Sequence, residues 1–196
     1  MTRGSGLLEG FLARQRSRQA RTLIPPSSGN GRVLDIGCGS YPLFLVGSEF
    51  AEKFGLDRVP VSLPDELRSA NLKIVKHDVH TGAQLPFPAD CFDVVTMLAV
   101  FEHLEPTVLS RLLAEIRRIL KPGGIYVMTT PAHWTDWLLK VLARLRLVSH
   151  EEIDEHQDSY RHPAIRSYLE GAGFASERIR TGYFEAGVNT WATAAK

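Results

Sequence analysis

The residues best suited to do chemistry lie in a short stretch, VLDIGCGSYP, at positions 33–42. Apolar residues around Asp35 predict a buried strand, and Gly37 and Gly39 follow it directly. Two glycines let the backbone turn tightly and let a ligand approach it closely. Pro42 suits the first turn of a helix, whose free N–H groups favour negative charge. The stretch therefore predicts a strand, a glycine loop and a helix that hold a nucleotide-like ligand.

Two interpretations of this loop are open from its residues. The dinucleotide fingerprint G-x-G-x-x-G has a third glycine where this chain has Pro42. The other interpretation starts from Asp35, which precedes Gly37 by two residues in the motif D-I-G-C-G-S. Asp57 does not separate the two, because a dinucleotide site also uses an acid about twenty residues after its glycines.

The elements that must position this loop alternate along the chain. We expect strands at 32–37, 53–57, 72–78, 92–100 and 125–131, helices at 6–23, 42–52, 106–120, 134–147 and 163–172, and two closing strands within 175–196. Parallel strands need crossover helices, whereas the last two strands can pair through a tight turn. The order predicts an α/β fold with an open, mostly parallel sheet of seven strands, an antiparallel C-terminal hairpin and helices on both faces.

Composition restricts the partners and the compartment. The 196 residues are 44% hydrophobic and 23% charged, and we expect one domain over 1–196 that begins with a helix within 1–25. A net charge of +1 does not favour nucleic acid. The two cysteines form no CxxC pair, and the N-terminus lacks the apolar segment of a secretory signal. We therefore expect a cytoplasmic protein, as a monomer or a homodimer.

Several motifs in order resemble class I S-adenosylmethionine (SAM)-dependent methyltransferases of the type 11-like group. D-I-G-C-G-S resembles their first motif, GLD at 55–57 the second and HDV at 77–79 the third. LPFPADCFDVVTMLAVFEHL resembles the segment around strand four, and LKPGGIYVMTTP the turn into strand five. The resemblance covers about residues 30–130 closely and the tail in topology. It implies a Rossmann-like fold and SAM as cofactor.

The resemblance also implies which residues hold the cofactor. Asp57 would accept hydrogen bonds from both ribose hydroxyls, Asp78 would meet the adenine amino group, and Val79 would abut the ring. The full set implied is Asp35, Gly37, Cys38, Gly39, Tyr41, Asp57, Asp78, Val79 and Leu98.

Tyr41 departs from the family pattern, because it stands where a third glycine is usual. A tyrosine cannot permit the same backbone approach near the methionine part of the cofactor. Two interpretations are open: the ring lines the pocket beside the methionine tail, or it packs outward under residues 1–25.

Glu102 and His103 follow strand four and are the candidate catalytic residues. His titrates near neutral pH, which suits it to accept a proton from a hydroxyl acceptor, although His103 could instead cap or pack at the next helix. Nucleic-acid amino-methyltransferases carry an Asn/Asp-Pro-Pro-aromatic motif here, where this chain has LAVFEHL. We therefore expect a small-molecule or lipid-linked acceptor, methylated at oxygen, and no nucleic-acid substrate.

Residues 132–162 form the candidate substrate lid, in which His150 and Tyr160 are the proposed substrate contacts. Its histidines and acids match no metal-binding spacing, so we expect no metal. The helix at 134–147 could lie on a membrane surface, but a core helix with a basic edge is the favoured interpretation. Two other functions stay open: a nicotinamide-dependent oxidoreductase, and a non-catalytic SAM-binding regulatory subunit.

Overall fold

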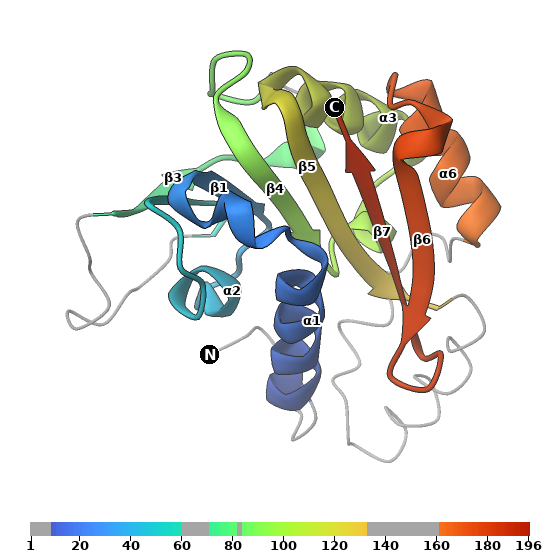
Figure 1. Cartoon of the computed structure of the whole chain (residues 1–196), viewed down its shortest axis with the longest axis horizontal. Helices are drawn as coiled ribbons and strands as arrows, with labels where there is room; N and C mark the ends of the chain where they lie inside the picture. The colour runs from blue at the N-terminus through green and yellow to red at the C-terminus, as the bar shows by residue number, and fades with distance from the viewer. Residues whose placement is uncertain (1–8, 60–70, 82–83, 133–160) are drawn as a thin grey trace.

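A seven-stranded sheet in the order β3-β2-β1-β4-β5-β7-β6 organises the chain (Figure 1). The computed structural model describes residues 9–59, 71–81, 84–132 and 161–196. The strands are β1 (Arg32–Ile36), β2 (Glu52–Asp57), β3 (Leu72–Lys76), β4 (Phe92–Leu98), β5 (Leu120–Pro131), β6 (Ile179–Phe184) and β7 (Asn189–Ala195). The first five are parallel, whereas β7 runs antiparallel to both β5 and β6. This arrangement confirms the predicted fold class and the closing hairpin.

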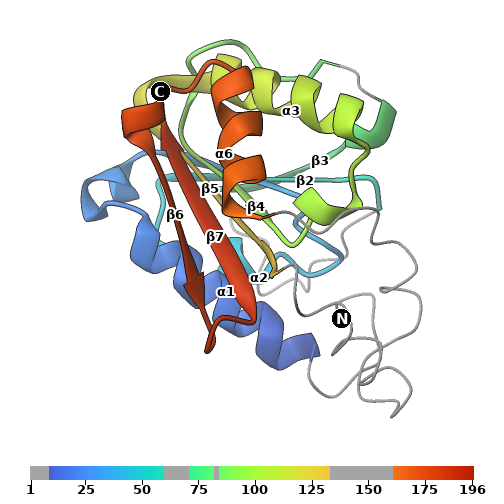
Figure 2. The ribbon, with the colours of Figure 1, turned by 90° about the vertical axis from the view of Figure 1, so that its right-hand side faces the viewer.

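Helices cover the two faces of the sheet. They are α1 (Glu9–Leu23), α2 (Leu43–Val46), α3 (Pro106–Ile119) and α6 (His162–Gly171), with short 3-10 turns η1 (Pro26–Asn30), η3 (Val79–Thr81), η4 (Phe101–His103) and η6 (Ser176–Arg178). Figure 2 shows α3 and α6 on one face and α1 on the other. No helix among the described residues is long and apolar enough to cross a membrane.

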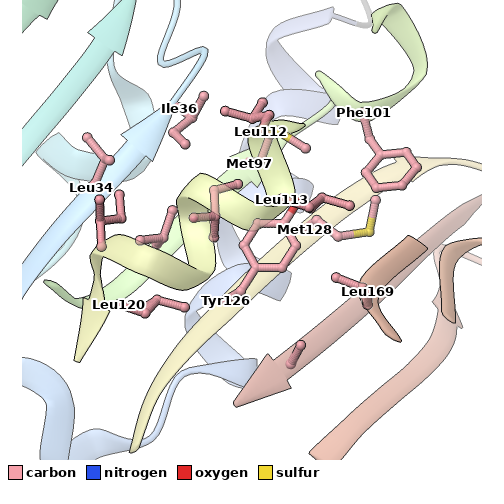
Figure 3. Packing of buried hydrophobic residues seen from close by; sticks show 14 of the residues in the cluster. Leu34, Ile36, Met97, Phe101, Leu112, Leu113, Leu120, Tyr126, Met128 and Leu169 are labelled. Atoms are coloured by element: carbon pink, nitrogen blue, oxygen red, sulfur yellow. The ribbon is translucent and has the colours of Figure 1, made fainter. Parts of the chain in front are cut away.

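Successive side chains along a strand point to opposite faces of the sheet, so the core forms a cluster on each face. Leu34 and Ile36 of β1 belong to the cluster under α3 and α6, whereas Val33 packs with the α1 and α2 residues. A strand buried on both faces can carry neighbouring apolar residues, as β4 does with Val94 and Val95. Figure 3 shows the larger cluster, in which Leu112 and Leu113 of α3 lie with Tyr126 and Met128 of β5.

Four expected boundaries were wrong by two residues or more. One is the end of strand three, which is Lys76 instead of 78. The helix expected at 42–52 is only α2, because Gly47 follows its single turn and its carbonyl accepts a 2.6 Å hydrogen bond from Arg21 of α1. Strand five begins at Leu120 instead of 125, since Leu120 already pairs with Phe92. Strand four ends at Leu98 because the next residue adopts a left-handed conformation.

The Tyr126 hydroxyl offers a test of this core. It is fully buried and has no hydrogen-bond partner in the described part of the chain, and burial together with the Glu102 carboxylate raises the pKa of Tyr126 well above its ordinary value. We expect Tyr126→Phe to raise the free energy of unfolding by about 1 kcal/mol, because it removes an unsatisfied polar group. Leu113→Ala should instead cost about 3 kcal/mol. Denaturant unfolding measures both, and a loss of stability in Tyr126→Phe would contradict the expectation.

Candidate active site

The glycine loop after β1 is held by the backbone of β2. The N–H groups of Gly37 and Cys38 both donate to the Leu56 carbonyl, at 2.7 and 3.3 Å. Gly37 and Gly39 have φ values of +73° and +71°, a region that residues with a Cβ rarely adopt. The loop therefore continues the β1–β2 pairing beyond the strand before it turns away.

The two glycines are required for different reasons. A Cβ on Gly37 would lie 2.3 Å from Cγ2 of Val100, so the loop after β4 fills the space beside it. A Cβ on Gly39 would meet no atom within 4 Å. Gly37 thus permits a close contact between two loops, whereas Gly39 borders open space that a ligand can use.

Asp57 joins the end of β2 to this loop. Its Oδ2 accepts the Gly39 N–H at 2.8 Å, and its Oδ1 accepts the Val59 N–H at 2.9 Å. The side chain is half-buried. Each carboxylate oxygen keeps a second acceptor position, so Asp57 can still bind two ligand hydroxyls.

Asp35 is almost fully buried at the end of β1, with 4% of its surface exposed. Its Oδ1 accepts a 2.6 Å hydrogen bond from the Thr96 hydroxyl of β4. Burial raises the pKa of Asp35 to about 7, although the Thr96 hydrogen bond lowers it and the Asp57 charge raises it further. Sequence reasoning missed Thr96, whose signal was a single hydroxyl among the apolar residues at 94–98.

Cys38 and Tyr41 lie in the same loop. Cys38 is buried, and desolvation together with the charges of Asp35 and Asp57 raises the pKa of its thiol far above the ordinary value. A neutral, buried thiol is a packing residue and a poor nucleophile. Tyr41 is half-buried, and its carbonyl accepts the Leu43 N–H at 2.8 Å. The predicted contact of its ring with a cofactor stays a prediction.

The chain after β3 returns to the end of β2. The His77 N–H donates to the Asp57 carbonyl at 2.9 Å, which places the next residue, Asp78, at the same edge of the sheet. Asp78 accepts the His80 N–H through Oδ1 at 3.0 Å and so begins η3. Val79 packs against the core under α3, whereas Leu98 of β4 packs against the opposite cluster.

The turn after β4 carries the two candidate catalytic residues. Ala99 has a φ of +55°, and its N–H donates to the Thr129 carbonyl of β5 at 2.9 Å. Glu102 is 2% exposed, and its Oε2 accepts a 3.0 Å hydrogen bond from the Thr130 hydroxyl. His103 is half-buried at the end of η4. Glycine and asparagine adopt left-handed conformations more often than alanine does, so nothing in the sequence indicated this conformation at Ala99.

The candidate substrate contacts, His150 and Tyr160, lie outside the described residues, as do most of the expected lid and the whole helix expected at 134–147. The described end of that lid differs from expectation in one respect, because His162 already begins α6.

The described residues fit an adenosyl cofactor. The open space beside Gly39 accommodates a group against the loop, and Asp57 offers acceptor oxygens at its border. Asp35 is a buried carboxylate whose side-chain partner among the described residues is the neutral Thr96 hydroxyl, and such a group suits a ligand with positive charge. These features lie at the carboxyl ends of parallel strands, where open α/β sheets bind ligands.

The methyltransferase domain family matches residues 8–178. The chain belongs to the SAM-dependent methyltransferases. SAM is therefore the methyl donor, and membership of this family decides against the nicotinamide alternative.

Individual relatives agree with this family. A probable S-adenosylmethionine-dependent methyltransferase of Mycolicibacterium smegmatis is 33% identical over 104 residues, which are 50% of this chain and 37% of that protein. An uncharacterized methyltransferase of Schizosaccharomyces pombe is 32% identical over 106 residues, which are 47% of this chain and 37% of that one. The chain thus spans little more than a third of the length of these curated relatives.

Solved structures share the fold. A SAM-dependent methyltransferase from Mesorhizobium loti has a TM-score of 0.65 and 17% identity, with 94% of this chain and 100% of that chain covered. A structure from Nostoc punctiforme, described as a putative O-methyltransferase, has a TM-score of 0.70 and 18% identity, with 94% and 56% covered.

The different constraints on the glycines of this methyltransferase give separable effects. Gly37→Ala should cost about 3 kcal/mol of unfolding free energy, because a Cβ meets Val100 and the positive φ is strained. Gly39→Ala should cost only about 1 kcal/mol for the strain, but its methyl group enters the open space, so S-adenosylhomocysteine affinity should fall at least about tenfold. Denaturant unfolding and calorimetric titration measure the two effects.

Gly123→Ala is the matched control, because Gly123 also has a positive φ, +80°, and open space around it, but lies at the opposite end of the sheet. It should show the strain and leave binding unchanged. Adding Val100→Ala to Gly37→Ala should restore part of the lost stability. Equal affinities for Gly39→Ala and Gly123→Ala would contradict a ligand beside Gly39.

Proposed function

We propose that this domain transfers a methyl group from SAM to an oxygen atom of a small-molecule or lipid-linked acceptor. The observation that carries the proposal is the joining of Gly39 to Asp57 beside the buried Asp35 carboxylate, in a chain of the SAM-dependent methyltransferase family. The three residues combine a close backbone approach, hydroxyl acceptors and negative charge at one edge of the sheet.

Each of these residues suits one part of the cofactor. Asp57 would accept the two ribose hydroxyls, because its oxygens keep acceptor positions beyond the bonds to Gly39 and Val59. Asp78, at the neighbouring strand end, would receive the adenine amino group, with Val79 against the ring. Asp35 would face the charged amino-acid tail, and Cys38, Tyr41 and Leu98 would line the remaining surface.

Bound SAM supplies a methyl group that its positively charged sulfur already activates. The protein's contribution is then to hold the acceptor in line and to remove a proton where the acceptor is a hydroxyl. No metal enters this scheme. The side chains available for the second task lie on η4, directly after β4.

We assign His103 as the base and Glu102 as the residue that holds the turn. Glu102 is buried and bonded to Thr130 of β5, so its carboxylate fixes η4 against the sheet. His103 follows it at the half-buried end of that turn. The segment LAVFEHL has no Asn/Asp-Pro-Pro-aromatic motif, which supports an oxygen acceptor over a nucleobase amino group. His150 and Tyr160 remain the proposed acceptor contacts.

Calorimetric titration with S-adenosylhomocysteine, beside NAD and NADP, tests the cofactor site. We expect binding of the first compound alone. Asp57→Asn should weaken this binding by roughly tenfold to a hundredfold, because one charged acceptor oxygen is lost. Asp90→Asn is the matched control, since Asp90 is exposed and pairs with Lys196 at the other end of the sheet. Binding of a dinucleotide alone would refute the proposal.

Turnover with a panel of hydroxy and carboxy compounds tests the proposed base. With a hydroxyl acceptor, His103→Ala should lower kcat by about 10² to 10⁴ and leave S-adenosylhomocysteine affinity unchanged. His80→Ala, which alters an exposed histidine, should retain full turnover. Full activity in His103→Ala would remove the base. Methylation of amine acceptors alone would remove the oxygen assignment, and cofactor binding without any methylation would favour a regulatory subunit.

A further inference from the structure

One hydroxyl group lies among the apolar residues at 94–98 of β4. Thr96 is fully buried, and its Oγ1 lies 2.6 Å from Oδ1 of Asp35, directly across the pairing with β1. The Leu34 carbonyl is a second acceptor, but at 3.4 Å. A hydroxyl donates one proton, so the shorter contact with the carboxylate takes it.

Packing in the sheet does not require a hydroxyl at position 96, because valine would pack there equally well. β-branched residues pack well on a pleated surface, and the flanking strand residues Val94, Val95 and Met97 are apolar. Burying a hydroxyl costs free energy unless it finds a partner. The partner here is the Asp35 carboxylate, so the function of the Thr96 hydroxyl is tied to that group.

Asp35 itself lacks a positive partner among the described residues. The Asp57 carboxylate of β2 makes a negative charge on Asp35 more costly, and the Cys38 thiol of the loop is neutral. The helix α2 has no ionisable side chain, and residues 10–23 of α1 have arginines as their only ionisable type. A carboxylate in such a place is suited to the cationic part of a ligand.

We propose that Thr96 is a positioning residue of the cofactor site, which keeps the Asp35 carboxylate ionised and in one orientation for the ammonium group of the cofactor's amino-acid tail. The inference rests on the proposed function, because it takes the ligand to be SAM or its demethylated product. Thr96 itself touches no ligand and acts through Asp35.

The proposal makes cofactor affinity depend on pH in a defined direction. Because the pKa of Asp35 is raised to about 7, the carboxylate becomes fully ionised only above neutral pH. Affinity for a ligand that carries the ammonium group should therefore rise as pH rises through 7. The Thr96 hydrogen bond lowers this pKa, so its loss should shift the rise in affinity to higher pH.

The first test is calorimetric titration with S-adenosylhomocysteine across about pH 5.5 to 8.5. Thr96→Val should bind about tenfold more weakly at neutral pH, with its affinity rising at higher pH than in the wild type. Thr96→Ser, which keeps the hydroxyl, should restore both values. Methylthioadenosine, which has the adenosine but no ammonium group, should bind equally to wild type and Thr96→Val.

Thr193→Val is the matched control, because Thr193 is a buried threonine of β7, which β5 separates from β4. It should bind S-adenosylhomocysteine as the wild type does. An unchanged affinity and pH profile in Thr96→Val would overturn the proposal. So would an equal loss of methylthioadenosine affinity, since that would indicate a general disturbance of the site.

A second test needs no cofactor and separates this inference from the proposed function. A carboxyl whose pKa is raised on folding contributes stability at low pH and loses it as pH rises through the folded value. Thr96→Val should therefore lower the melting temperature more at about pH 8.5 than at about pH 5.5, because only the ionised carboxylate misses its donor. Equal decreases at the two pH values would overturn the Thr96 assignment, whereas failure of the wild type to bind S-adenosylhomocysteine would overturn the proposed function.

Discussion

The parallel pairing of β1 with β2 on one side and with β4 on the other is the constraint on which the site depends. It places Asp35 between Gly55 and Thr96 and aligns the carboxyl ends of three strands. The pairing continues past the strands, because the Gly37 N–H still donates to the Leu56 carbonyl. Backbone hydrogen bonds therefore position the loop, and its side chains are left for chemistry.

Two buried carboxylates, on opposite faces of the sheet, are each stabilised by a threonine hydroxyl. Asp35 is bonded to Thr96 on the face of α1 and α2, and Glu102 is bonded to Thr130 on the face of α3 and α6. In both pairs the hydroxyl comes from the adjacent element, so each pair joins two segments at the edge of the site. A buried carboxylate is costly without such a donor. The same two hydrogen bonds therefore stabilise the buried carboxylates and position the segments that carry them.

The strands of the sheet could be predicted from the sequence because the patterns that mark them are local. Apolar runs bounded by turn residues identify strands, and the alternation with helices predicts parallel order. Boundaries set by tertiary contacts were missed, such as the end of α2, where Arg21 of α1 binds the Gly47 carbonyl. The candidate site divides in the same way. Asp35 and Asp57 were proposed from motifs that resemble those of the family, but Thr96 depends on a pairing between distant strands and Ala99 on a conformation unusual for its type.

The unusual conformation of Ala99 helps to bring three loops into contact. A left-handed alanine costs about 1 kcal/mol, which the structure retains because the turn sends Val100 into the space beside Gly37. That contact joins the loop after β4 to the loop after β1, and Asp57 joins the latter to the end of β2 through the Gly39 N–H. Residues that share such contacts act non-additively. A substitution in the turn that carries Glu102 and His103 should therefore also affect the glycine loop after β1.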